Sequence, residues 1–166
     1  MNERDAAPGA VVRPASSGSG ARSSTSWRRM LGRVAATNER AHIEHVLRTY
    51  VDSWATGDVD GRLALFAENI VTEDPATVRQ ATGKAELRDL LLAGIPADWK
   101  LAFSFERVAI VADEAILTYR VSLQAGDGTP ADLLVNAHAV FGADGLIHQF
   151  RTFFDADAIT DHPNDR

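Results

Sequence analysis

Two adjacent acids, Glu73 and Asp74, lie at the end of a short apolar run and directly before Pro75, in the stretch NIVTEDPATV. Successive side chains of a strand point to opposite faces of a sheet, so only one of the two acids is expected to face the interior. A carboxylate that faces an apolar pocket is able to act as a general base. An aspartate before a proline is also common at exposed turns, and the motif alone leaves both interpretations open.

A second group with possible chemistry is the pair His42 and His45, in the stretch HIEH. Their spacing would allow both imidazoles to bind one metal ion from the same side of a helix. Both histidines lie off the apolar stripe that passes through Ile43, Val46 and Tyr50, and this favours exposure to solvent. We therefore predict no metal site. The chain also lacks cysteine, a glycine-rich phosphate loop and a serine protease-like arrangement.

Composition and charge limit the classes of function. The 166 residues are 45% hydrophobic, which suits one globular domain, and no apolar run is long enough to span a membrane. Residues 1–34 contain six arginines and two acids, a balance of +4, whereas residues 35–166 contain 11 basic and 21 acidic residues, a balance of −10. An acidic domain argues against nucleic acid as the main partner.

The first 36 residues are rich in Gly, Ser, Pro and Arg, and we predict that they are disordered. The twin arginine at Arg28 and Arg29 is typical of an export signal, but the residues after it lack the apolar run that such a signal requires. We therefore expect a cytoplasmic protein. The predicted domain spans residues 37–158, followed by a C-terminal tail at 159–166.

Three helices are predicted at the start of the domain. The first begins after Asn38, a suitable N-cap, and ends at Gly57, where a C-cap is expected. A short helix is predicted within residues 58–69 and a third within residues 82–94. After them, alternating segments and turns predict antiparallel hairpins at 100–111, 114–124, 131–141 and 146–154. This order predicts an α+β fold in which three N-terminal helices pack on one face of a curved, cone-shaped antiparallel sheet.

Alternation also sorts the residues of the predicted strands by face. In strand 131–141 the apolar set is expected to face the interior of the cone, and it consists of Leu133, Val135, Ala137, Ala139 and Phe141. His138 and Asp132 fall on the outer face, where we predict pairing with a second copy of the chain. In the last strand Phe150, Thr152 and Phe154 share the inner face, and His148 is expected on that face at the mouth of the cone.

The stretch TYVDSWATGDVDGRLALFAENIVTEDP resembles the N-terminal half of the ketosteroid isomerase family. This family belongs to the nuclear transport factor 2-like superfold, which also contains the SnoaL-like polyketide cyclases. The later stretches VFGADGLI and FRTFFD are similar to the closing strands of the family, so the resemblance covers about residues 40–158. Asp155 and Asp157 match the common ending of these domains and are expected to cap the C-terminal segment.

The resemblance implies roles for individual residues. Asp74 matches the general base that carries a proton between two carbons of a steroid. Tyr50 matches the tyrosine that donates a hydrogen bond to the substrate oxygen as negative charge develops. The reaction of the family needs no cofactor.

The sequence departs from the family at three positions. The second donor of the family, a protonated aspartic acid, is replaced by Ala137, and loss of one such donor costs about 2.7–4 kcal/mol of transition-state stabilisation. Two further pocket tyrosines are replaced by Phe66 and Leu91. Tyr119, at a position expected to face inward, is a candidate for the missing hydroxyl.

We therefore predict an enzyme of the ketosteroid isomerase or SnoaL-like type that moves a proton on a small apolar carbonyl compound. Asp74 is the predicted base and Tyr50 the predicted oxyanion donor. The predicted pocket wall consists of Trp54, Phe66, Leu91, Tyr119, Val135, Ala137, Phe150, Thr152 and Phe154. The alternative is a non-catalytic binding module or dimeric interaction module on the same fold, in which Asp74 is only a specificity contact.

Overall fold

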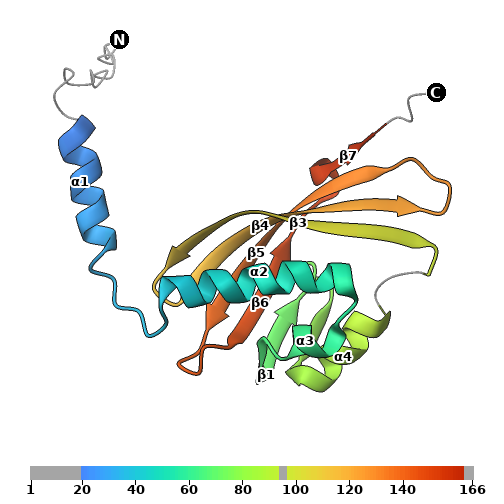
Figure 1. Cartoon of the computed structure of the whole chain (residues 1–166), viewed down its shortest axis with the longest axis horizontal. Coiled ribbons are helices and arrows are strands. Elements are labelled where there is room, and N and C mark those ends of the chain that lie inside the picture. Colours follow the sequence, from blue (N-terminus) through green and yellow to red (C-terminus); the bar gives the residue numbers. More distant parts are fainter. Residues whose placement is uncertain (1–19, 94–96, 163–166) are drawn as a thin grey trace, which may run out of the picture. The chain divides into compact units, whose positions relative to one another are not determined.

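The computed structural model describes residues 20–93 and 97–162 (Figure 1). Residues 1–34 and residues 35–166 form separate units. Within the first unit, helix α1 spans Gly20–Leu31. The sequence composition predicts disorder for this part of the chain, whereas the structure has a helix. Trp27, Met30 and Leu31 recur at helical spacing, and composition alone does not reveal this periodicity. The rest of the predicted tail, residues 1–19, lies outside the described residues.

The second unit begins with the helices that the sequence predicts. Helix α2 spans Arg40–Thr56, α3 spans Val59–Leu63 and α4 spans Gly83–Ala93. Gly57 ends α2 in the left-handed conformation with a φ of 66°, as predicted. No described helix is long and apolar enough to cross a membrane.

The N-terminus of α2 differs from the prediction. Its N-cap position is Glu39, which makes no capping hydrogen bond with its side chain. The side chain of Asn38 instead donates to Asp113 and to the carbonyl oxygen of Gly142, each at 2.9 Å. Asn38 thus fastens the start of α2 to two turns of the sheet rather than capping the helix.

The strands form one curved, open sheet with the order β2-β1-β6-β5-β4-β3, and β7 pairs with β5 (Figure 1). Their bounds are Phe66–Glu73 for β1, Gln80–Thr82 for β2, Trp99–Val111 for β3, Glu114–Ala125 for β4, Ala131–Phe141 for β5, Ile147–Phe153 for β6 and Ile159–Asp161 for β7. Helix α2 packs on β3 and β4, while α4 packs on β1 and β2.

The predicted α+β fold with a curved sheet is confirmed, and the strands differ from the prediction in two respects. The sheet is mixed rather than antiparallel, because β1 pairs in parallel with β6. Turn signals reveal only pairings between strands that are neighbours in the chain, and they carry no information on this long-range pair. In addition, the predicted C-terminal tail contains β7, which pairs with residues 131–133 of β5.

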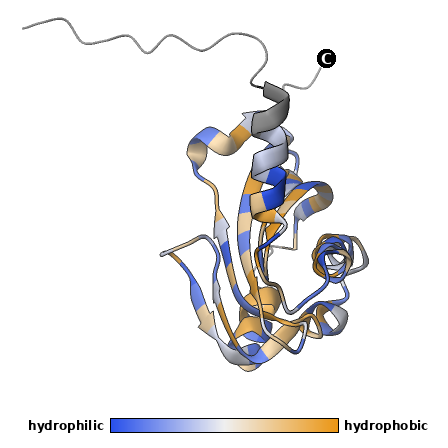
Figure 2. Ribbon diagram, turned by 90° about the vertical axis from the view of Figure 1, so that its left-hand side faces the viewer, coloured by the Kyte–Doolittle hydropathy of each residue, from blue (hydrophilic) through white to orange (hydrophobic). Residues whose placement is uncertain are grey.

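The two faces of the sheet follow the predicted alternation for most of its length, and hydrophilic and hydrophobic residues alternate along the strands (Figure 2). Val135, Ala137 and Ala139 of β5 are buried in the core. In β6 an irregular register between Ile147 and Gln149 interrupts the alternation. Ile147 is therefore buried on the inner side. His148 was expected on the same face as Phe150, and it does not lie there.

Candidate active site

Asp74 follows directly after β1, and its carboxylate is held by the neighbouring strand. The hydroxyl of Thr152 on β6 donates a hydrogen bond of 2.5 Å to Asp74 Oδ1. Its other oxygen, Oδ2, has no hydrogen-bond partner in residues 20–93 and 97–162. The backbone turns away at this point, because the amide of Asp74 donates to the carbonyl of Arg79 at 2.8 Å. Asp74 thus keeps one carboxylate oxygen free to accept a proton.

The side chain of Glu73 points away from that of Asp74, as the alternation of the strand predicts. Its carboxylate accepts hydrogen bonds from the amide of Thr77 and the guanidinium of Arg151, both at 3.0 Å. The Thr77 amide and then Arg151 hold the pKa of Glu73 below its usual range. The two adjacent acids are therefore distinct: Glu73 is an ion-paired surface carboxylate, and Asp74 is not paired with a cation among the described residues.

A cavity of about 130 Å³ lies beside Asp74. Its lining residues are Trp54, Asp74, Arg79, Leu90, Leu91, Leu101 and Phe103. The walls are apolar except for the carboxylate of Asp74 and the guanidinium of Arg79, which form no ion pair with each other in the described structure. The Arg79 side chain makes one long hydrogen bond, of 3.5 Å, to the carbonyl of Leu90.

Two buried tyrosines lie next to this cavity without lining it. Tyr50 on α2 and Tyr119 on β4 are 5% and 4% exposed, and their ring centroids are 6.2 Å apart. Burial raises the pKa of both hydroxyls, and the negative charge of Asp74 raises the pKa of both as well. Both tyrosines are therefore neutral hydrogen-bond donors at physiological pH, within electrostatic reach of the carboxylate.

Trp54 lines the open cavity, and its ring is in edge-to-face contact with that of Tyr50. Its indole ring stacks on Phe103 with a centroid distance of 4.6 Å and an interplanar angle of 7°. The guanidinium carbon of Arg62 lies 3.5 Å from the centroid of the same ring. The indole nitrogen Nε1 is buried and has no hydrogen-bond partner with acceptable geometry among the described residues, although it is near enough to Tyr50 to lower the pKa of that hydroxyl.

Arg62 is a buried cation that the sequence analysis missed. It is only 2% exposed, and its guanidinium donates to the hydroxyl and to the carbonyl of Ser53, both at 2.9 Å. Burial lowers the pKa of Arg62, while electrostatic interactions with Tyr50 and with the Asp58 carboxylate oppose this shift. Helix α3 is only five residues long, so it offers no periodicity from which the burial of one arginine could be predicted.

The predicted pocket wall is divided among three places. Trp54 and Leu91 line the cavity together with Asp74. Thr152 and Phe154 line a different hollow. The remaining predicted residues are packed in the hydrophobic core: Phe66, Tyr119, Val135, Ala137 and Phe150. The other lining residues, Arg79, Leu90, Leu101 and Phe103, were not predicted, because the meeting of α4, β3 and the turn after Asp74 at one cavity depends on the whole fold.

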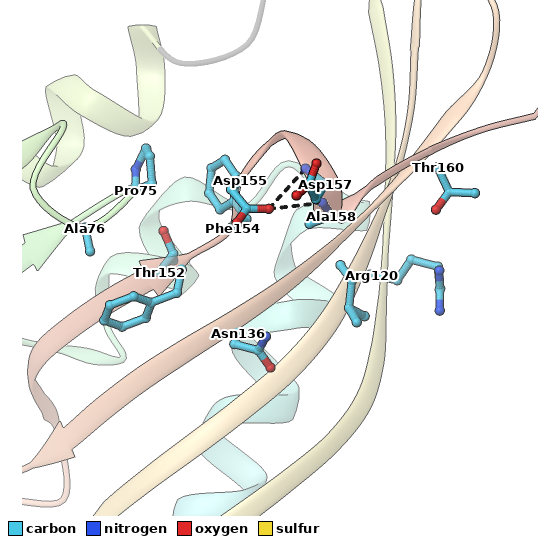
Figure 3. Close-up of a pocket in the computed structure, with 12 residues that line it drawn as sticks. Pro75, Ala76, Arg120, Asn136, Thr152, Phe154, Asp155, Asp157, Ala158 and Thr160 are labelled. Atoms are coloured by element: carbon cyan, nitrogen blue, oxygen red, sulfur yellow. Dashed lines mark hydrogen bonds between the residues drawn. The ribbon is translucent and has the colours of Figure 1, made fainter.

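A larger hollow of about 620 Å³ lies on the outer side of the sheet (Figure 3). It is lined by Pro75 and Ala76, by outer-face residues such as Arg120 and Asn136, and by residues 152–160. Its charged groups serve the fold: Arg120 pairs with Glu106 and Asp132, and Asp155 accepts hydrogen bonds from the amides of Asp157 and Ala158, as its predicted capping role requires. Although it is larger, this hollow is not lined by Asp74.

Three of the four histidines considered above have structural partners. His42 contacts the carbonyl of Gly145 at 2.8 Å, His138 contacts Glu114 at 2.7 Å and His148 contacts Asp144 at 3.0 Å. Within the described residues, no group of three or more His, Asp or Glu side chains is arranged to hold a metal ion.

Residues 47–150 match the family of SnoaL-like domains. The chain belongs to the SnoaL-like family. This assignment places it in the nuclear transport factor 2-like superfamily, as the sequence resemblance implied. The match includes most of the elements described above, from α2 to β6.

Several solved structures have the same fold. RV0760c from Mycobacterium tuberculosis is 19% identical with a TM-score of 0.63, and the match covers 75% of this chain and 99% of that one. The Delta 5-3-ketosteroid isomerase from Mycobacterium sp. is 22% identical with a TM-score of 0.61, covering 73% and 98%. SalBIII, an epoxide hydrolase/cyclase-like enzyme in pyran ring formation in the polyether salinomycin, is 18% identical with a TM-score of 0.65, covering 75% and 98%. At these identities the likeness establishes the fold.

Proposed function

We propose that the protein catalyses cofactor-independent proton transfer on a small apolar carbonyl compound, with Asp74 as the general base. The observation that carries the proposal is the carboxylate of Asp74 in an apolar cavity, held through one oxygen by Thr152 and free at the other. A general base must combine a fixed position with an accessible lone pair. The SnoaL-like family, and a ketosteroid isomerase among the structures with this fold, favour this class of reaction.

In the proposed reaction Asp74 removes a proton from the carbon next to the carbonyl group. The electron pair of the broken C–H bond moves into the carbonyl, so that negative charge develops on its oxygen. For a β,γ-unsaturated ketone, Asp74 then returns the proton to the γ carbon, and the product is the conjugated isomer. All atoms and electrons are accounted for without a second reactant. Tyr50 is the proposed donor to the charged oxygen, because its raised pKa keeps it protonated.

The volume of the cavity restricts the size of the substrate. Pockets for drug-sized ligands measure about 300–1,000 Å³, and an apolar cavity of about 150 Å³ holds one benzene ring. A cavity of about 130 Å³ therefore accepts one ring or a short branched chain. We propose that the substrate is a small cyclic or branched ketone, or a larger molecule of which only the reacting end enters.

The test is the isomerisation of the β,γ-unsaturated form of cyclohexenone, followed by the ultraviolet absorbance of the conjugated product. We expect the wild-type protein to accelerate the reaction and Asp74→Asn to remove the acceleration. Asp52→Asn is the matched control, since Asp52 is exposed on α2. Equal rates for wild type and Asp74→Asn would contradict the proposal.

The second candidate function is ligand binding without catalysis. The observation in its favour is that Trp54 and Phe103 line the cavity, whereas the two tyrosines that contact their rings do not. A binding module is expected to bind cyclohexanone equally well in wild type and Asp74→Asn, and to accelerate no isomerisation in either.

We also propose that the outer face of the sheet binds a second copy of the chain. Support comes from apolar side chains exposed on this face, among them Leu134 at 37% and Phe153 at 44%. They border the larger hollow, which a partner surface would fill.

A further inference from the structure

The buried indole N–H of Trp54 requires an explanation. Buried polar groups in native proteins almost always have hydrogen-bond partners, and an unpaired one costs roughly 1–3 kcal/mol. Trp54 Nε1 is the one buried side-chain nitrogen or oxygen without a partner in the described part of the chain. The same residue lines the cavity that holds Asp74.

The polar side chains near this N–H include the two buried tyrosines. Tyr50 and Tyr119 bring two hydroxyl groups to the same region, where these hydroxyls interact with each other, and neither donates to a carbonyl or carboxylate of the described residues. The rings of Trp54 and Tyr50 meet edge to face with centroids 6.3 Å apart, so the indole lies beside this tyrosine. A ligand with an acceptor oxygen would give the Trp54 N–H the partner that the described residues do not supply.

The indole ring is held in a fixed position. Phe103 stacks on it at 4.6 Å and the Arg62 guanidinium lies 3.5 Å from its centroid, so the ring is clamped between an aromatic ring and a cation. Arg62 is in turn anchored by its two hydrogen bonds to Ser53. A donor that does not need to reorganise stabilises developing charge most effectively.

We propose that the indole N–H of Trp54 donates a hydrogen bond to the oxygen of the carbonyl ligand, beside Tyr50, and so acts as the second oxyanion donor of this site. This inference rests on the proposed function. It supplies a donor in a chain where Ala137 occupies the position of the second donor in the ketosteroid isomerases. The proposal also restricts the ligand to apolar molecules of about one ring that carry an acceptor oxygen at the end that faces Trp54.

The test uses a Trp27→Phe/Trp99→Phe variant, in which Trp54 is the sole tryptophan. Both replaced side chains are exposed, at 63% and 41%, and lie outside the cavity lining. The single indole N–H resonance is then followed by nuclear magnetic resonance during titration with cyclohexanone. The matched ligand is methylenecyclohexane, which has nearly the same shape and no acceptor oxygen.

We expect cyclohexanone, but not methylenecyclohexane, to shift the indole proton downfield, and to bind at least about tenfold more tightly, as expected for one hydrogen bond to a buried donor. Trp54→Phe, which keeps an aromatic ring, should slow the isomerisation by about 100-fold. Replacement of Trp54 by its benzothiophene analogue, which keeps the size of the indole and lacks the N–H, should do the same and controls for packing.

Two results would overturn the inference: an indole resonance that moves equally with both ligands, or a benzothiophene variant as active as the single-tryptophan protein. If either result is found while turnover still depends on Asp74, the proposed function remains supported and only the role of Trp54 is refuted. A ketone-specific shift without turnover in the wild type would instead contradict the proposed function and support Trp54 as a donor in a binding site.

Discussion

The hydroxyl of Thr152 on β6 donates a hydrogen bond of 2.5 Å to Oδ1 of Asp74, a residue 78 positions earlier in the chain. The parallel pair β1–β6 makes this contact possible, because it places Glu73 beside Arg151 and thus Asp74 beside Thr152. Thr152 is 1% exposed and cannot easily move. The carboxylate of Asp74 is therefore oriented by the core of the sheet rather than by the turn that follows it.

This hydrogen bond leads to a first prediction. Thr152→Val keeps the shape of the side chain and removes the donor, so the isomerisation rate should fall about 10–100-fold, the equivalent of one hydrogen bond to a charged group. Thr152→Ser keeps the donor and should retain most of the activity. A Val variant as active as the Ser variant would show that Asp74 does not depend on this contact.

The two tyrosines provide a prediction that does not depend on activity. They are the only tyrosines in the chain, so alkaline titration of tyrosinate absorbance reports on Tyr50 and Tyr119 alone. Burial raises the pKa of both, so the folded protein should show no transition near the ordinary value of about 10. A transition near that value while the circular dichroism is still native would contradict the burial of these hydroxyls.

The same shifts determine how stability depends on pH. Above about pH 10 the tyrosines of the unfolded chain release protons, whereas those of the folded chain retain them. The contribution of these residues to stability is therefore complete below about pH 10 and is lost as the pH rises toward the raised pKa values of the folded state. The free energy of unfolding should fall less steeply in this range for Tyr50→Phe, and an unchanged slope would argue against the shift.

Arg62 is expected to stabilise the site through its position. Arg62→Lys loses the planar stacking on Trp54 and at least one hydrogen bond to Ser53, and we expect a loss of about 2 kcal/mol in urea unfolding. The matched control is Arg48→Lys, since Arg48 is exposed and lies over Phe105 at 3.8 Å; surface changes of this kind cost within about 0.5 kcal/mol. Equal losses for both variants would mean that burial gives Arg62 no special role.

The proposed pairing of two chains is tested by light scattering after size-exclusion chromatography. The wild type is expected to be a dimer, and Leu134→Glu together with Phe153→Glu should yield a monomer, because two charges would be buried without partners. Leu92→Glu, at an exposed position of α4, is the control and should remain a dimer. A monomeric wild type would refute the pairing.

Local patterns account for the parts of the fold that could be predicted. Gly57 follows an apolar helical stripe, and the alternation of β5 identifies Val135 and Ala137 as core residues. The same alternation separates Glu73 from Asp74. Each of these inferences needs only a short window of sequence, where the period of the helix or strand is the dominant physical constraint.

The features that could not be predicted depend on contacts between distant segments. No local pattern places Thr152 beside Asp74, Arg62 over Trp54 or Arg79 at the cavity. The family resemblance indicated Asp74 and Tyr50 as candidate site residues. It could not indicate that the cavity is small, because the cavity volume depends on how Trp54, Phe103 and the leucines of α4 pack together. The register irregularity at His148 likewise arises from pairing with β5.

The central claim is that Asp74 removes a proton from carbon, and deuterium exchange tests it most directly. Cyclohexanone in deuterium oxide exchanges the hydrogens next to its carbonyl group, and nuclear magnetic resonance measures the rate without requiring a complete turnover. We predict that the wild-type protein and Asp52→Asn accelerate the exchange above the buffer rate and that Asp74→Asn does not. Exchange at the same accelerated rate in Asp74→Asn, or no acceleration by the wild type, would contradict the assignment of Asp74 as the base.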